Sequence, residues 1–236
     1  MSNDFDTRFE SAGTATEMAR RFPGMHDAAR NLWNTAMDNP ALTPRMKELV
    51  LLAIFASPAG YDQAVVDVQI DRATQAGASP GDVADVLVSV AGIANHALYF
   101  ALPLAEEAFS KEEILEGVDD ATLAAVQRLK DDFVKVRGFW NPERDVLGRV
   151  LPDYLVAAGN YSTAAARHGS LTAAEREMIY ISVDASVNHM SELGLRIHFQ
   201  NARKAGVAFK QVAAVLKIVG VVGFLAYIRS SRHLAH

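Results

Sequence analysis

The stretch LTAAEREMIYISVDAS, residues 171–186, decides how the chain is expected to fold. Thr172 can cap a helix, and Glu175 three residues later completes the capping-box pattern. The apolar run that follows is typical of a buried helix. A second stretch, LTPRMKELVLLAIFAS at residues 42–57, has the same design, with a threonine cap followed by Pro44 at the first helical position. The chain is therefore expected to contain this helix twice.

The two helices belong to a longer internal repeat. An offset of 129 positions aligns residues 23–97 with residues 152–226 without an insertion. The second helix of each copy ends in a similar way, with QIDRATQAG at residues 69–77 and HFQNARKAG at residues 198–206. The final glycine of each stretch suits the left-handed cap that ends many helices. We therefore predict a duplicated helical module.

A third helix is expected in each copy. In the first copy, SPGD at residues 79–82 opens it with a capping serine. In the second copy, its counterpart lies in the apolar segment 212–228, which carries Lys217 and is shorter than the roughly 20 residues that cross a bilayer. We predict a buried core helix there. No strand pattern is found, so the expected fold is all-α, with two tandem modules packed as one unit.

The expected organisation has three parts. Residues 1–100 form an N-terminal module, residues 101–150 a helical connector, and residues 151–236 a C-terminal module. The connector is acidic at first and ends in RGFWNPERD, so we expect one more helix followed by a loop at Gly138–Pro142. The candidate active site is assigned to the C-terminal module.

Composition excludes several classes of function. The chain has no cysteine, so disulfides, thiol catalysis and cysteine-ligated metal or iron–sulfur sites are impossible. The formal net charge of −5 argues against a nucleic-acid partner, because such proteins usually present a basic face. The N-terminal sequence MSNDFDTRFE is polar and acidic, unlike a signal peptide. We expect a cytoplasmic protein with neither a nucleic-acid nor a membrane partner.

Two polar residues on apolar helix faces identify a candidate site. His198 lies on a small, apolar face of its helix, and Glu177 precedes the apolar run MIYI in the helix before it. The first copy has Glu48 and Gln69 at the same two positions. Burying such a group without a partner costs a few kcal/mol. Glu177 and His198 are therefore expected to meet, either as a general acid–base pair or as a structural hydrogen bond.

Four further polar residues of the second copy are candidates for substrate contacts. Asp184 lies two turns after the candidate glutamate, on the same helix face. His189, Glu192 and Arg196 are spaced to share one face. This face is either a cleft in which Arg196 binds a carboxylate, or a solvated stripe with a Glu192–Arg196 ion pair. A metal site of His189, Glu192 and His198 would require a break in the helix, so no metal is expected.

These motifs resemble the carboxymuconolactone decarboxylase/AhpD-like superfamily. The matching order is LTAAERE (171–177), an apolar helix, HFQNARKAG (198–206) and another apolar helix. The first copy is similar through LTPRMKE (42–48) and QIDRATQAG (69–77). The resemblance implies an all-α fold that forms homo-oligomers. Two fused modules can take the places of two subunits, so we expect a trimer of this chain, or a dimer.

The resemblance implies two branches of chemistry. The peroxidase branch uses a cysteine pair whose positions are occupied here by His189 and Glu192, so thiol peroxidase activity is excluded. The decarboxylase branch removes CO₂ from a lactone carboxylate without a cofactor, and Glu177 and His198 match its acid–base positions. The separation between those two residues is slightly longer than the family pattern in both copies, which can rotate His189 and Glu192 relative to the site.

Two classes of function follow. We favour a cofactor-independent lyase, with no metal and no organic cofactor, that acts on a small, anionic carboxylated lactone or unsaturated keto acid. In it, His198 donates a proton, Glu177 sets the tautomer and Arg196 holds a carboxylate. An isomerase or tautomerase would use a similar substrate. The alternative class is a non-catalytic ligand-binding or scaffold protein, which would surround the histidine with dry, apolar side chains. The first copy is expected to keep the architecture alone, unless His96 completes a composite site.

Overall fold

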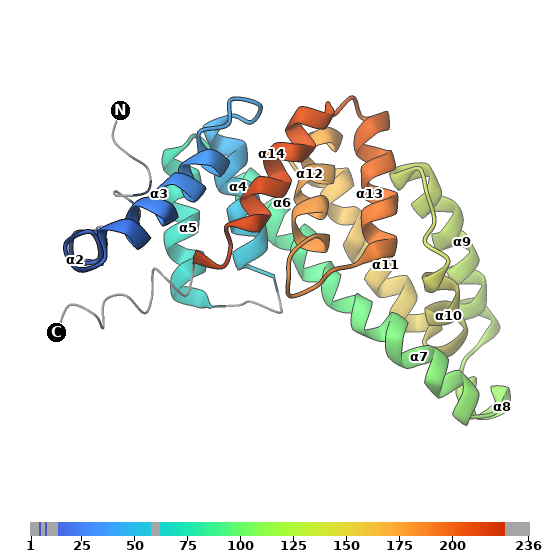
Figure 1. The fold of residues 1–236 in the computed structure, drawn as a ribbon. Coiled ribbons are helices and arrows are strands. Elements are labelled where there is room, and N and C mark those ends of the chain that lie inside the picture. Colours follow the sequence, from blue (N-terminus) through green and yellow to red (C-terminus); the bar gives the residue numbers. More distant parts are fainter. Residues whose placement is uncertain (1–4, 6–7, 9–13, 58–61, 225–236) are drawn as a thin grey trace.

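A computed structural model describes residues 5, 8, 14–57 and 62–224 of the chain. Every regular element in these ranges is a helix, and no strand occurs among the described residues. The helices form an elongated bundle that runs from α2 at one end to α8 at the other (Figure 1). The prediction of an all-α fold is confirmed.

The described helices follow one another along the whole chain. In order they are α2 (Thr14–Arg21), α3 (Pro23–Met37), α4 (Pro44–Phe55), α5 (Gln63–Gln75), α6 (Pro80–Ala91), the 3₁₀ turn η1 (Gly92–Asn95), α7 (His96–Ala108), α8 (Lys111–Ile114), α9 (Asp120–Arg137), α10 (Glu143–Val150), α11 (Pro152–His168), α12 (Ala173–Asp184), α13 (Glu192–Lys204) and α14 (Phe209–Gly220).

The helix boundaries repeat at the offset found in the sequence. Moving α4, α5 and α6 by 129 positions gives the first and last residues of α12, α13 and α14. The same local signals explain the agreement. Thr43 and Thr172 each accept a hydrogen bond from the third helical backbone N–H, and Gly77 and Gly206 have φ angles of 97° and 83°. The division into three domains and the origin by duplication stay predictions.

Both halves contribute to one hydrophobic core. α4 and α12 lie next to each other and are buried along most of their length, with Leu49, Leu52, Ile179 and Ile181 fully buried. A helix that is apolar on all sides must be covered on all sides. The neighbours that cover this pair are α5, α6, α13 and α14 (Figure 1).

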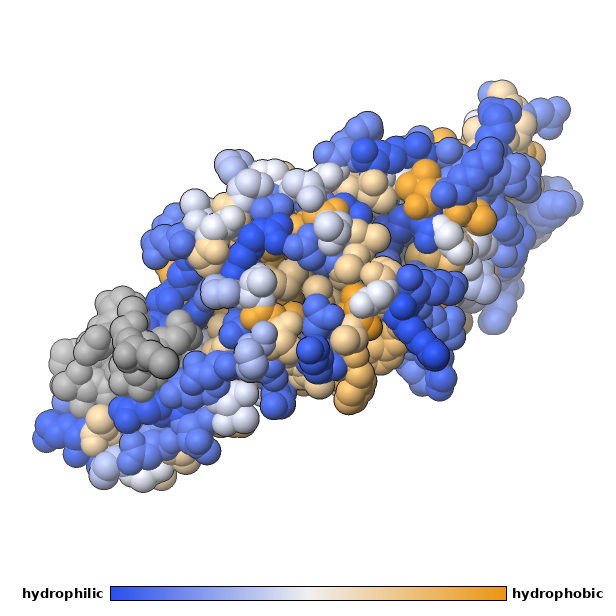
Figure 2. Space-filling view, turned by 90° about the horizontal axis from the view of Figure 1, so that it is seen from above, coloured by the Kyte–Doolittle hydropathy of each residue, from blue (hydrophilic) through white to orange (hydrophobic). Residues whose placement is uncertain are grey.

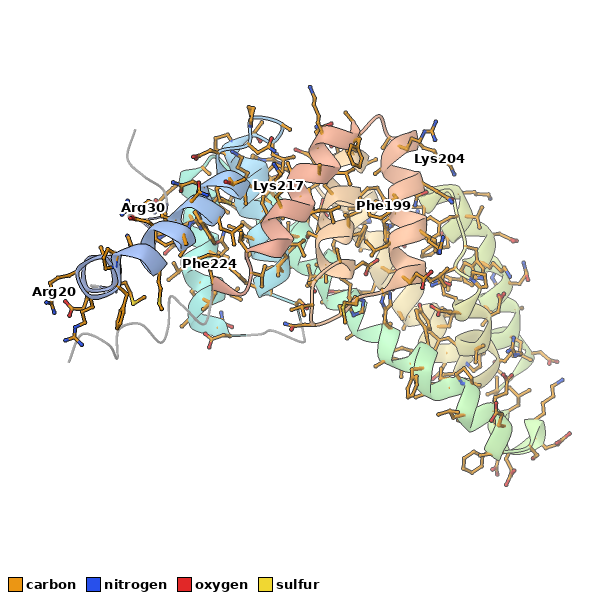
Figure 3. All side chains as sticks on the ribbon, in the orientation of Figure 1. Arg20, Arg30, Phe199, Lys204, Lys217 and Phe224 are labelled. Atoms are coloured by element: carbon orange, nitrogen blue, oxygen red, sulfur yellow. The ribbon has the colours of Figure 1, made fainter. Side chains whose placement is uncertain are left out.

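α14 is the helix expected in the apolar segment 212–228. Val212, Val215 and Ile218 are buried, whereas Lys217 is exposed on the opposite face. The core-helix prediction therefore holds for the described part of the segment, and residues 225–228 lie outside the described residues. Figure 3 labels Lys217 on α14.

Another stretch has membrane-like composition. By length and composition alone, the continuous helix Pro80–Ala108 could cross a bilayer, and 28% of its most apolar window is buried inside the structure. The absence of a membrane partner stays a prediction. Polar residues cover much of the face seen from above, and apolar residues gather near its middle (Figure 2).

The connector is more elaborate than the single helix expected from the sequence. It contains α8, α9 and α10, and it packs with α7 and α11 around a second apolar cluster of Leu102, Leu129, Leu147 and Leu155. The expected loop at Gly138–Pro142 is present. Gly138, with a φ of 75°, ends α9. This turn brings the end of α9 and the start of α10 towards α12, where they supply side chains to the site described next.

Candidate active site

Glu177 on α12 and His198 on α13 form the central contact of the site. Nδ1 of His198 lies 2.6 Å from Oε2 of Glu177. Both side chains are largely buried, at 12% and 10% exposure. Because the carboxylate accepts a hydrogen from Nδ1, Nε2 remains for a second partner or a substrate. The expected meeting of the two residues is thus present in the structure, and its catalytic role stays a prediction.

Arg137 and Tyr180 support this pair. Nη1 of Arg137 donates to the hydroxyl of Tyr180 at 2.9 Å, and Nη2 lies 3.8 Å from Oε1 of Glu177. The ring of Tyr180 stacks on that of His198, with centroids 4.7 Å apart. Burial by itself would lower the pKa of Arg137, but Tyr180 and Glu177 outweigh it and the pKa is raised.

Arg144, near the start of α10, is the second cation of the site. Its guanidinium lies 4.3 Å from the ring centre of Phe133 and 5.8 Å from that of Trp140. Within the described part of the chain it forms no ion pair, and its buried Nε has no hydrogen-bond partner. Burial lowers its pKa. A guanidinium with unused donors in a low-dielectric setting is suited to bind an anion.

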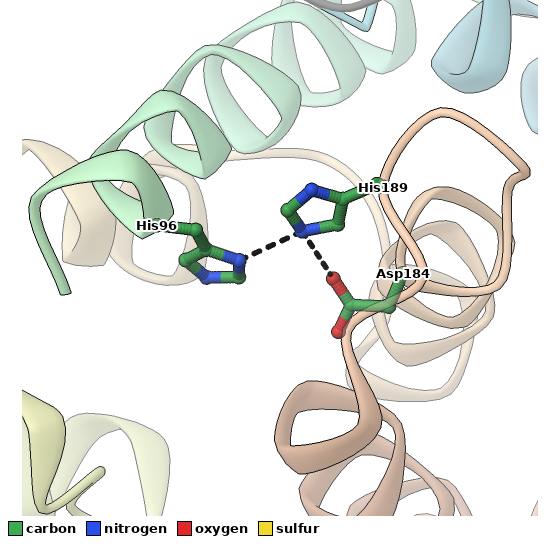
Figure 4. A group of neighbouring side chains, drawn as sticks. All are labelled: His96, Asp184 and His189. Carbon is green, nitrogen blue, oxygen red and sulfur yellow. Dashed lines mark hydrogen bonds and ion pairs between the residues drawn. The ribbon is translucent and has the colours of Figure 1, made fainter. Parts of the chain in front are cut away.

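Asp184 extends the network towards the N-terminal half. It is 1% exposed, and its two oxygens lie 3.3 Å from Nε2 of His189 and 3.8 Å from Nε2 of His198. Nε2 of His189 also lies 2.7 Å from Nδ1 of His96 (Figure 4). Burial lowers the pKa of His96 to about 4, so this ring is neutral at pH 7. Five ionisable groups thus form one chain, from Glu177 to His96.

Three members of the network, His96, Asp184 and His198, line a pocket that is not sealed by aliphatic side chains. A cavity of about 70 Å³ is lined by His96, Arg137, Arg144, Tyr180, Asp184 and His198, among others. A shallower depression of about 520 Å³ shares His96 and Tyr99 with it and also includes His189. The inner cavity has room for a group of a few atoms, such as a carboxylate. The rest of a larger ligand would occupy the outer depression.

Arg196 and Glu192 do not line this pocket. They pair with each other at 2.6 Å on the surface of α13, where their side chains are 70% and 80% exposed. This is the solvated stripe that was the second interpretation, so the expectation of two cleft residues is corrected. At 100° per residue, Arg196 lies about 200° around the helix from His198, on nearly the opposite face. His189 precedes α13 and belongs to the turn before it, which is why it reaches the site.

The corresponding positions of the N-terminal half form a closed polar cluster. Nε2 of Gln69 donates to Oε2 of Glu48 at 2.7 Å. Arg8, which is 129 positions before Arg137, donates to the same oxygen at 3.1 Å. Gln69 is 2% exposed and Arg8 is 6% exposed. The glutamate is thus fully occupied by partners that cannot exchange protons near neutral pH.

The residues around this cluster are apolar, whereas the equivalent residues of the C-terminal half are polar. Phe55 and Leu51 occupy the positions equivalent to Asp184 and Tyr180, and both are buried in the core. The N-terminal half therefore contributes to the pocket through His96 rather than through its own copy of the acid–base pair.

Comparison with known proteins finds a related family and a related fold. Residues 152–236 match the sequence model of the carboxymuconolactone decarboxylase family. A crystal structure from Burkholderia xenovorans LB400, provisionally named a gamma-carboxymuconolactone decarboxylase subunit, has the same fold, with a TM-score of 0.85. It is 25% identical, over 99% of this chain and 94% of that one. The family model covers the C-terminal part of the chain and the fold is shared along its length, so both findings support the resemblance to the carboxymuconolactone decarboxylase/AhpD-like superfamily. No curated protein matches it.

The connector supplies two site residues that the sequence did not predict. Arg137 and Arg144 both come from the stretch RGFWNPERD, which precedes the part that matches the carboxymuconolactone decarboxylase family. The sequence does contain a signal for these residues: two arginines lie beside two aromatic residues in a connector that is otherwise mostly acidic. Tyr180 lies in an apolar helix, where a tyrosine usually belongs to the hydrophobic core, so the sequence did not indicate a role in the site.

Proposed function

We propose that the protein is a carboxy-lyase of the carboxymuconolactone decarboxylase type, acting on a small carboxylated lactone or unsaturated keto acid. One observation carries the proposal. His198, whose Nδ1 is hydrogen-bonded to Glu177, lines the same cavity as the unpaired guanidinium of Arg144. A proton-transfer group and an anion-binding group are the two parts that such a reaction requires.

The substrate carboxylate is assigned to Arg144, with Arg137 as a second cation beside the pair. A guanidinium binds a carboxylate through two parallel hydrogen bonds, which also fixes its orientation. Arg196 was the residue expected to do this, but its exposed position makes it a poor choice, because a solvent-exposed ion pair contributes little. The anionic substrate expected from the sequence thus remains, with different residues to hold it.

The chemical step is loss of CO₂ from carbon next to an unsaturated carbonyl group. The bond to the departing carboxylate breaks, and its electron pair moves onto the carbonyl oxygen as a dienolate. The doubly protonated His198 then gives the Nε2 proton to carbon, and water restores it. Glu177 accepts the Nδ1–H throughout and so keeps the ring oriented.

An isomerase would use the same groups in another order. The neutral ring of His198 would first accept a proton from carbon through Nε2 and later return it elsewhere. No CO₂ would be released, and solvent deuterium would enter recovered substrate. The non-catalytic alternative requires a dry, apolar environment for His198, which the polar pocket does not favour.

The test is turnover of a panel of carboxylated lactones and unsaturated keto acids, with release of CO₂ and ultraviolet absorbance as readouts. We expect His198→Ala and Glu177→Gln to lower turnover by about 10²–10⁴-fold, the usual contribution of a positioned acid or base. Matched controls are His168→Ala and Glu192→Gln, which change exposed residues of the same types. If both site variants turned over the substrate as fast as the wild type, the proposal would be wrong.

The assembly belongs to the same proposal. Val187, Met190 and Phe199 are exposed apolar residues on and before α13, as expected where another copy packs. We expect a cytoplasmic homo-oligomer, a trimer or a dimer. Light scattering on the purified chain would measure its mass, and a monomer at micromolar concentration would contradict this expectation.

A further inference from the structure

The buried acidic residues of the described chain differ in their partners. They are Asp82, Asp85, Glu177 and Asp184. The first three each lie near an arginine: Arg45, Arg176 and Arg137, in that order. Among the residues that the structure describes, only the imidazoles of His189 and His198 lie within ion-pair distance of Asp184. A buried carboxylate normally requires a cation, so Asp184 lacks the compensation that the other three have.

The fold itself does not require an acid at this position. The equivalent residue of the N-terminal half is Phe55, which is buried in the same core. Oδ2 of Asp184 is buried and has no hydrogen-bond partner among the described residues. This oxygen faces Nε2 of His198 at 3.8 Å, whereas the other oxygen, Oδ1, faces His189. A buried carboxylate that the packing does not need points to a ligand.

Two imidazole nitrogens lie beside this carboxylate. Nδ1 of His96, Nε2 of His189 and an oxygen of Asp184 all lie within 4.8 Å of one another (Figure 4). The three residues come from the start of α7, the turn before α13 and the end of α12. Two of them are held at helix ends and the third in the short turn that joins α12 to α13, so packed helices fix all three positions.

We propose that His96, His189 and Asp184 bind one divalent transition-metal ion of the zinc class. Two imidazoles and one carboxylate are a donor set that suits such ions and leaves positions open for water or substrate. The expectation of no metal was based on His189, Glu192 and His198. The proposed ligand set keeps His189 but has Asp184 and His96, the latter from the N-terminal half, in place of Glu192 and His198.

The distances are close to those of a bound ion. Metal–nitrogen bonds of about 2.0–2.1 Å place two donors of a tetrahedral site about 3.3 Å apart. Nε2 of His189 and Oδ1 of Asp184 are already 3.3 Å apart. The two histidine nitrogens are 2.7 Å apart, the length of an N–H···N hydrogen bond, so binding would exchange that hydrogen for the ion and separate the rings by about 0.6 Å.

The site also has an entry path. His96 lines both the inner cavity and the outer depression, and His189 lines the outer one. An ion held there would face a ligand in either space and could polarise a substrate oxygen. The inference goes beyond the proposed lyase function and does not depend on it, because metal binding requires no substrate.

The test is titration of the untagged, chelator-treated chain with Co²⁺ and then Zn²⁺, without any substrate. We expect one Co²⁺ per chain, visible absorption bands typical of low-coordinate cobalt, and their loss when Zn²⁺ is added. His96→Ala, His189→Ala and Asp184→Asn should each weaken binding by at least about 10-fold, since even second-shell changes cost 10–100-fold. His168→Ala and Asp153→Asn, at exposed positions, should bind as the wild type does.

Melting temperatures without metal show which variants fold. If Asp184→Asn does not fold, the two histidine variants decide the question. Zn²⁺ should raise the melting temperature of the wild type and of the exposed controls, but not of the site variants. Absence of saturable binding, or equal affinity in the wild type and the histidine variants, would overturn the proposal and leave a hydrogen-bonded histidine pair. A chain that binds Co²⁺ but turns over no substrate contradicts only the lyase function.

Discussion

Arg8 and Arg137 are 129 positions apart, and each guanidinium faces the equivalent, largely covered glutamate of its own half, Glu48 or Glu177. Nη2 of Arg8 lies 2.5 Å from Oε1 of Glu48, whereas Nη2 of Arg137 lies 3.8 Å from Oε1 of Glu177, and Arg137 donates to Tyr180 instead. Each half thus keeps an arginine beside this glutamate. The halves differ in the other partner of the acid, because Glu177 is hydrogen-bonded to His198, whose imidazole can exchange a proton near neutral pH, and Glu48 is hydrogen-bonded to Gln69, which cannot.

The N-terminal cluster is expected to stabilise the fold without affecting turnover. Gln69→Ala removes two hydrogen bonds to Glu48, one to its carboxylate and one to its backbone carbonyl. We expect a loss of about 1–3 kcal/mol in the free energy of unfolding, measured in urea, with unchanged kcat. His198→Ala should do the reverse, with a large loss of kcat. A fall in kcat for Gln69→Ala would show that the first half takes part in catalysis.

Arg144 should control substrate affinity, and Arg196 should not. Arg144→Met removes a donor pair to the substrate carboxylate, so we expect KM to rise by about 10–100-fold, the equivalent of one charge-assisted bond. Arg196→Met changes an exposed side chain and should leave KM within about twofold. Steady-state kinetics on the same substrate compare the two. A larger rise in KM for Arg196→Met than for Arg144→Met would mean that the substrate carboxylate binds at the surface of α13 instead.

The ion pair between Asp85 and Arg176 should hold the two halves together. Both residues are buried, and Nη2 of Arg176 lies 2.7 Å from Oδ2 of Asp85. Arg176→Met leaves the carboxylate buried and uncompensated, so we expect it to cost about 3–5 kcal/mol of unfolding free energy. In the Asp85→Asn/Arg176→Met double variant the loss should be smaller. Strictly additive losses in this double-mutant cycle would mean that the two charges do not interact.

Asp82 should make part of the free energy of unfolding depend on pH in the acidic range. The hydrogen bond from Arg45 holds the pKa of Asp82 below its usual range, with help from Ser170 and Ser79. Because its pKa in the folded chain is below that in the unfolded chain, this stabilisation is complete above about pH 4 and is lost as the pH falls further. Urea unfolding at pH 7 and pH 3 should show that Asp82→Asn costs about 1–3 kcal/mol at pH 7 and less at pH 3. An equal cost at both pH values would contradict this assignment.

Gly194 should be needed because it leaves room for Asp184. A Cβ at this position would clash with Oδ2 of Asp184, whereas nothing lies within 4 Å of a Cβ built on Gly220. We expect Gly194→Ala to cost about 1–3 kcal/mol of unfolding free energy, because it forces a buried carboxylate to move. Gly220→Ala in α14 should be neutral or slightly stabilising, since alanine favours helices. Equal urea midpoints for both variants would show that Asp184 can move freely.

The sequence alone determined the local structure of this protein. Caps such as Thr172 and Gly206 act over a few residues, so their effect can be read without knowing the rest of the chain. The offset of 129 positions then carries one set of helix boundaries onto the other. The pairing of Glu177 with His198 was also accessible, because adjacent antiparallel helices bring facing polar residues together.

Tertiary structure alone decided which other polar groups join them. His96 meets His189 across 93 positions, and Arg137 meets Tyr180 across 43. No local pattern encodes such separations, since they depend on how the connector turns at Gly138 and how α7 crosses the bundle. The chain offers many polar residues with similar spacing, and helix packing selects the few that share a cavity. Arg196 is the clearest example: its guanidinium could bind a carboxylate, but it lies on the solvent-exposed face of α13 and does not reach the cavity.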